Sequence, residues 1–182
     1  MASAHRLLRG FAILVDMISL AGAVAAAVAL ASIALIMGAE IIARSAFGVS
    51  LDFSWEFSAY LMAALFFLGA AYTLRTGSHI RMGAAVEHFS PRVAAALDVA
   101  ATLIGLAVML LVTYALTDLA WQAHMRGSVS ATPMETYMAV PQSVPAIGAA
   151  ILVLQLLARL ANRAAGLPVE QRPASDGAPG EL

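Results

Sequence analysis

Four stretches of the chain carry no charged residue and are long enough to cross a membrane. They comprise 23, 18, 19 and 23 residues, at positions 17–39, 57–74, 99–117 and 136–158. A helix rises 1.5 Å per residue, so about 20 residues cross a hydrocarbon core of about 30 Å. In lipid, a helix satisfies all its backbone groups within one segment. The pattern predicts an all-α integral membrane protein with four transmembrane helices, over about 14–39, 55–75, 92–119 and 136–158.

The composition agrees with this class. Of the 182 residues, 62% are hydrophobic and 12% are charged, whereas soluble domains are about 45–50% apolar and about 25% charged. The net charge of −1 gives no indication of a nucleic-acid partner. The chain has no cysteine, which excludes disulfides, thiolate catalysis and cysteine-ligated metal sites.

The first apolar stretch resembles a signal peptide in one respect, because Arg6 and Arg9 precede it. It is, however, far longer than an h-region of about 7–15 residues, and Asp16 stands at its start. We therefore expect it to remain as a transmembrane helix.

The arginines are distributed unevenly between the two sides of the predicted membrane. Eight precede the first span, separate the second from the third or follow the fourth, and two lie on the opposite side. The two sets are Arg6, Arg9, Arg75, Arg81, Arg92, Arg159, Arg163 and Arg172 against Arg44 and Arg126. Basic residues accumulate on the cytoplasmic side, so both termini are predicted to be cytoplasmic.

Two segments outside the spans have a distinct pattern. Apolar residues alternate with charged ones in the inner loop, 76–92, which predicts a short amphipathic segment in the membrane interface between the second and third helices. The tail, 166–182, is rich in proline, glycine and polar residues and is predicted to be a disordered cytoplasmic extension of the membrane domain, 1–165.

Catalytic and redox functions find little support. A bis-haem protein needs histidine pairs within its helices, and the four histidines (His5, His79, His88 and His124) lie outside the predicted spans. No phosphate loop, HExxH motif or nucleophile elbow occurs. We expect neither an enzyme nor a cofactor.

Asp98 lies about 10 Å along the third helix from Pro91. A carboxylate at that depth is expected to face a partner helix, a water pocket or another protein chain.

Polar and aromatic residues gather near the outer ends of the first two helices. Glu40 and Arg44 are spaced i, i+4 and can pair. Ser54 can cap the second helix, whose first turn holds Glu56, and Trp55 and Tyr60 lie close by. The group is either a membrane-surface cap or a docking site for another subunit.

Small residues recur at helical spacing on the first two helices. They allow close helix packing, within the chain or with a partner. The predicted packing faces are Gly22, Ala26 and Ala29 on the first helix and Ala59, Ala63 and Ala70 on the second.

Together these features resemble the small permease (Q, DctQ-like) subunit of tripartite ATP-independent periplasmic (TRAP) transporters, over roughly 10–160. Members of this family show an arginine, a Phe-Gly turn, Trp-Glu, a Phe-Leu-Gly-Ala segment and Gly-x-His-Ile. The corresponding residues here are Arg44, Phe47-Gly48, Trp55-Glu56, Tyr60, Gly69-Ala70-Ala71, Arg75, Gly77 and His79-Ile80-Arg81. The chain departs from the family pattern at Gly83, where an acidic residue is expected, and at the start of the fourth helix.

The resemblance implies a non-catalytic scaffold subunit in a bacterial inner membrane. Its partners would be a large M subunit, which carries an organic acid with sodium by an elevator movement, and a periplasmic binding protein. The residues expected at subunit interfaces are Arg44, Trp55, Glu56, Tyr60, His79, Arg81 and Asp98.

The pattern leaves other classes open. A small independent transporter or channel that forms homo-oligomers is the first, although no polar stripe suited to a pore is visible. A membrane enzyme or cytochrome subunit is a second, and the four-span subunit of a tripartite tricarboxylate transporter is a third.

Overall fold

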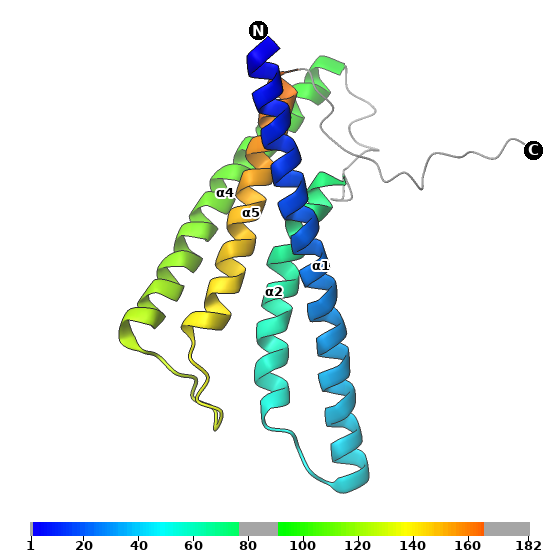
Figure 1. Ribbon diagram of the computed structural model, residues 1–182, viewed down its shortest axis with the longest axis vertical. Coiled ribbons are helices and arrows are strands. Elements are labelled where there is room, and N and C mark those ends of the chain that lie inside the picture. The colour runs from blue at the N-terminus through cyan, green and yellow to red at the C-terminus, as the bar shows by residue number, and fades with distance from the viewer. Residues whose placement is uncertain (1, 77–90, 166–182) are drawn as a thin grey trace, which may run out of the picture.

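A computed structural model describes residues 2–76 and 91–165, and this part of the chain contains four helices (Figure 1). All four are long and apolar enough to cross a membrane, which confirms the predicted all-α membrane class. The predicted amphipathic segment and the predicted disordered tail lie outside the described residues. The helices are α1 (Ala2–Phe47), α2 (Phe53–Arg75), α4 (Pro91–Arg126) and α5 (Ala139–Ala164).

Helices α1 and α4 are longer than a bilayer requires. They have 46 and 36 residues, whereas about 20 residues cross the hydrocarbon core. Both continue beyond the last apolar residues of their predicted spans until a glycine ends them. Gly48 and Gly127 have φ angles of 66° and 60°, a left-handed conformation that closes a helix at little cost only for glycine.

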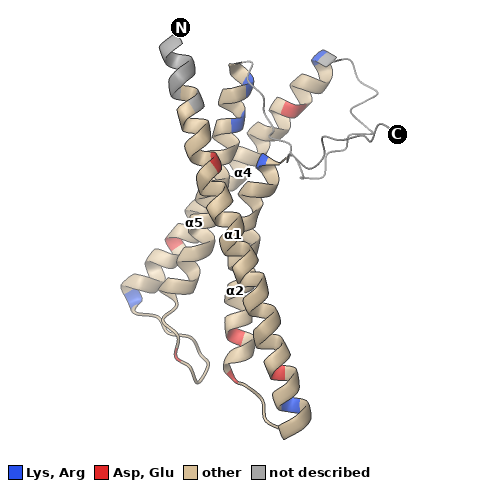
Figure 2. Ribbon diagram, turned by 45° about the vertical axis from the view of Figure 1, so that its right-hand side comes forward, with Lys and Arg blue, Asp and Glu red and all other residues tan. Residues whose placement is uncertain are grey.

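Helix α5 occupies the centre of the assembly. It contacts α1, α2 and α4, while α1 also packs along α2. In the most apolar part of α5, 44% of the residues are buried inside the protein, whereas the corresponding share in α4 is 6%. Figures 1 and 2 show that the α1–α2 and α4–α5 hairpins cross near the middle of the molecule and diverge towards their connecting loops.

Two glycines bring α1 and α5 onto the backbone of α2. A Cβ atom added to Gly22 of α1 would lie 2.8 Å from the carbonyl oxygen of Leu68. One added to Gly148 of α5 would lie 2.7 Å from the carbonyl carbon of Phe67. Small residues allow such close helix approach in membranes. The three helices therefore meet at one short segment of α2.

The packing face predicted on α1 is confirmed, because Gly22, Ala26 and Ala29 are buried. The face predicted on α2 is buried within the chain only in part, since Ala63 and Ala70 are half-buried. Ala59 is exposed, and the alanines buried most deeply are Ala64 and Ala71 rather than their predicted neighbours. The rotation of α2 about its own axis is set by its contacts with α1 and α5 at Leu68. The spacing of small residues within α2 does not specify that rotation.

Candidate functional site

A buried carboxylate on α1 fastens the connection between α1 and α2. Glu40 Oε1 accepts hydrogen bonds from Arg44 Nη2 at 2.5 Å and from Ser50 Oγ at 2.8 Å. Its Oε2 accepts a hydrogen bond from the backbone N–H of Leu51 at 2.7 Å. The predicted i, i+4 pair of Glu40 and Arg44 is therefore present. It does more than support the helix, because the same carboxylate also holds the residues that follow Gly48.

A second carboxylate, on α2, fastens the connection between α4 and α5. Glu56 is only 8% exposed. It accepts hydrogen bonds from the Tyr60 hydroxyl at 2.7 Å and from the Thr132 hydroxyl. The Tyr60 oxygen also lies 3.2 Å from the sulfur of Met138. Glu56 thus joins the two hairpins at the end where their helices diverge.

The segment that reaches Glu56, residues 127–138, is here called the outer strap. It folds back on itself through a single antiparallel bridge between Val129 and Tyr137. Within it, the Ser130 N–H donates to the Thr136 carbonyl at 2.9 Å, and the Thr136 N–H donates to the Ser130 hydroxyl at 3.1 Å. These bonds shape the strap so that Thr132 can meet the carboxylate of α2.

Arg44 and Glu56 belong to different clusters, since Arg44 bonds to Glu40 and Glu56 bonds to the strap. Trp55, in the first turn of α2, has 68% of its surface exposed. The predicted cap by Ser54 is wrong, because α2 begins at Phe53 and the buried Ser54 hydroxyl makes no hydrogen bond. The outer end thus combines an exposed Trp55 with two carboxylates that bond within the chain.

Asp98 lies at the opposite end of the molecule. Its Oδ1 is 2.9 Å from Arg159 Nη2, and its Oδ2 is 3.2 Å from Arg163 Nη1. Both arginines belong to α5, so Asp98 faces a helix of its own chain, the first of the environments expected for it. His79 and Arg81 lie outside the described residues.

A third polar cluster joins α1, α2 and α5, and the sequence analysis missed it. Asp16 Oδ1 lies 3.3 Å from Arg75 Nε and accepts a hydrogen bond of 3.3 Å from Gln155 Nε2. The Ser19 hydroxyl donates to Gln155 Oε1 at 3.1 Å. The available signal was weak, because Ser19 and Gln155 are isolated polar residues within uncharged stretches.

These contacts suit assembly better than chemistry. Within residues 2–76 and 91–165, no group of three or more histidines, aspartates and glutamates is placed to hold a metal ion. Asp16, Glu40, Glu56 and Asp98 are each bonded to other groups of the chain. The polar groups of these clusters therefore fasten the helices together.

The family comparison agrees with this arrangement. The model of the family described as the DctQ component of tripartite ATP-independent periplasmic transporters matches residues 33–166. The chain belongs to this family. The match contains both outer carboxylates, Trp55, the outer strap and the ion pair of Asp98 with Arg159. No curated protein and no solved structure matches the chain.

Membership identifies the chain as the small membrane component of a TRAP transporter, and such a component is part of a transport system rather than an enzyme. The DctQ match begins within α1, at residue 33, and therefore leaves out Gly22 and, of the third polar cluster, Asp16 and Ser19. The outer cluster and the central helix α5 lie within the matched part.

Proposed function

We propose that this DctQ chain is the scaffold subunit of a sodium-coupled transporter that imports an organic acid. In this proposal a large M subunit carries the substrate and the sodium ion, a periplasmic binding protein delivers the substrate, and the small subunit holds the M subunit in the membrane. The observation that supports it most directly is that the carboxylates of its helices bond to groups of the same chain. A transport site would instead offer such groups to the substrate or ion.

The proposed contact with the other subunits is the outer surface around Trp55. Its exposed indole provides the kind of aromatic anchor that is common in interface hot spots. Arg44, whose side chain is exposed, would form the polar rim, while the bond between Glu56 and Tyr60 would keep the start of α2 in shape. A second contact at the inner end would include Asp98, His79 and Arg81.

We further propose that both termini lie in the cytoplasm of a bacterium and that the chain resides in its inner membrane. The helix ends near the N-terminus of α1 carry Arg75, Arg92, Arg159 and Arg163, and the opposite ends carry fewer basic positions (Figure 2). This asymmetry follows the positive-inside rule.

Reconstitution tests the scaffold role. Liposomes that contain only this chain should show no uptake of labelled organic acids under a sodium gradient. Liposomes that contain the chain with its M subunit, supplied with the binding protein, should show uptake. Sodium-driven uptake by the chain alone would overturn the proposal and favour an independent transporter.

Substitution at the outer surface tests the contact. Trp55→Ala and Glu56→Ala should leave the chain inserted and expressed but reduce co-purification of the M subunit or the rate of uptake. Glu170→Ala, in the predicted tail, is the matched control and should change neither. Wild-type assembly and uptake in both outer variants would make the cluster a membrane-surface cap.

A further inference from the structure

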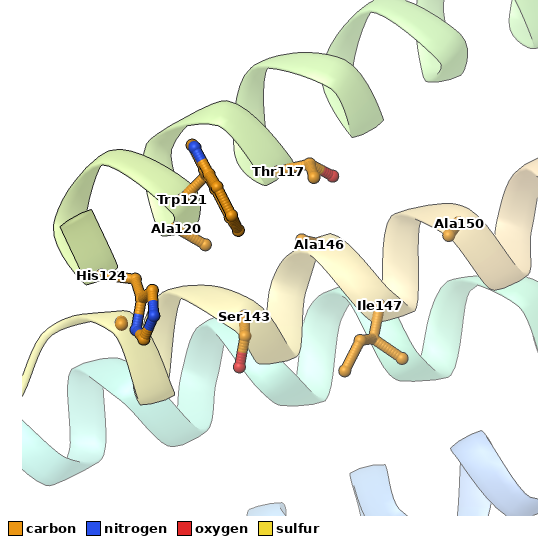
Figure 3. A pocket seen from close by; sticks show the side chains of 9 residues that line it. Thr117, Ala120, Trp121, His124, Ser143, Ala146, Ile147 and Ala150 are labelled. Atoms are coloured by element: carbon orange, nitrogen blue, oxygen red, sulfur yellow. The ribbon is translucent and has the colours of Figure 1, made fainter.

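A groove of about 460 Å³ lies between the outer halves of α4 and α5 (Figure 3). Its floor is formed by small side chains, including Ala120 of α4 and Ser143, Ala146 and Ala150 of α5. Trp121 and His124 line its outer end. Figure 3 shows Trp121 extending from α4 into the space beside α5.

The dimensions of the groove favour a slender occupant. Residues 139 and 150, at its two ends on α5, are separated by about 16 Å along the helix axis. Spread over that length, 460 Å³ corresponds to a cross-section of about 30 Å². A helix about 10 Å wide has a cross-section of about 80 Å², so it could rest on the groove only with part of its surface.

The position of the groove indicates what surrounds it. Its α5 wall lies within the uncharged stretch 136–158, and its α4 wall begins where the uncharged stretch 99–117 ends. In the orientation proposed above these residues face the outer leaflet, and the groove is open at the surface of the helices. The material that meets it there is the hydrocarbon of lipid chains.

The outer end has the chemistry of a headgroup site. Trp121 is 61% exposed, and its indole N–H donates to no group in the described part of the chain. His124 lies beside it, with ring centroids 6.1 Å apart, and its Nδ1 is 2.8 Å from the Tyr137 hydroxyl. Tryptophan and tyrosine favour the headgroup level because they join an apolar ring to a polar group.

We propose that this groove binds one phospholipid of the outer leaflet. An acyl chain lies along Ala146 and Ala150, and the glycerol ester or phosphate oxygens accept a hydrogen bond from the indole N–H of Trp121. The site is separate from the proposed contact at Trp55.

Native mass spectrometry tests this site on the protein purified in its native assembly, after exchange into a detergent that removes loosely held lipid. The wild type should retain one phospholipid per chain. Ala150→Phe fills the groove and should abolish retention, whereas Ala115→Phe, on the exposed surface of α4, should retain it. Trp121→Ala adds no bulk and should weaken retention without affecting the fold.

Two results would overturn the proposal. One is an absence of retained phospholipid in the wild type, and the other is equal retention in the wild type, Ala150→Phe and Trp121→Ala. Loss of the M subunit from Ala150→Phe, with no lipid in the wild type, would assign the groove to a protein segment instead. Sodium-driven uptake measures the scaffold role separately, so failure of one proposal is distinguishable from failure of the other.

Discussion

Replacing Gly148 with alanine is expected to destabilise the protein. The new Cβ would lie 2.7 Å from the carbonyl carbon of Phe67 and 2.8 Å from the backbone nitrogen of Leu68. Carbon atoms pack best about 3.5–4.0 Å apart. The obstacle is the backbone of α2, which cannot rotate away as a side chain can, so α5 must shift from α2 by about 1 Å.

Two terms determine the size of the effect. Overpacking in a tight interior costs about 1–3 kcal/mol, while alanine favours a helix over glycine by about 0.5–1 kcal/mol. The net cost is therefore up to about 2.5 kcal/mol, with a central value of about 1 kcal/mol. For a domain of this size, about 1 kcal/mol changes the melting temperature by about 2–4 °C, so Gly148→Ala should lower it by about 2–4 °C, and by about 10 °C at most.

The same substitution at other glycines of the spans provides matched controls. Gly22→Ala should behave like Gly148→Ala, since its Cβ would lie 2.8 Å from the Leu68 carbonyl oxygen. At Gly105 the nearest contact is 4.0 Å away, and at Gly38 nothing lies within 4 Å. Gly105→Ala and Gly38→Ala should therefore keep or raise the melting temperature, measured by size-exclusion chromatography of heated, detergent-solubilised protein. Equal melting temperatures in all four variants would refute the proposed backbone contact.

Other predictions concern the charged residues and the hydroxyl on α2. A reporter fused after Ala164 should be active only in the cytoplasm, and a label at Ser50 should react from outside; the reverse pattern would overturn the orientation. Asp98→Ala should destabilise the protein by about 1–3 kcal/mol, between the values for exposed and buried ion pairs. Adding Arg159→Leu to Asp98→Ala should restore part of the lost stability, measured as the melting temperature. If the effects of the two substitutions simply added in the double variant, the pairing would be contradicted. Tyr60→Phe removes a hydrogen-bond donor to Glu56 and should increase proteolytic cleavage of the outer strap. Equal cleavage of the variant and the wild type would contradict this expectation.

Features that depend on neighbouring residues could be predicted from the sequence. The uncharged stretches indicated the four helices because lipid requires each span to satisfy its own backbone. The Glu40–Arg44 pair followed from i, i+4 spacing, which places two side chains on the same face of a helix. The α1 face at Gly22 and Ala26 followed from the same periodicity.

Features that depend on how helices rotate against each other could not be predicted. The Glu56–Thr132 bond joins residues 76 positions apart, and the Ser19–Gln155 bond joins residues 136 apart. Nothing in either local sequence specifies the partner. The exposure of Ala59 has the same origin, because α1 and α5 approach α2 at Phe67 and Leu68 on its other side.

The central position of α5 has a consequence for how the protein is made. Chains are synthesised from the N-terminus, and α5 follows the three helices that it contacts. The α1–α2 hairpin can form while the ribosome is still working, but α4 has its main contact with α5 and must wait in the bilayer until α5 emerges. If synthesis stopped at the outer strap, α5 would not yet exist. Asp98 would then lack Arg159 and Arg163, and α2 would lack its contact with Gly148. Such a chain would be a clear substrate for the proteases that remove unfinished membrane proteins.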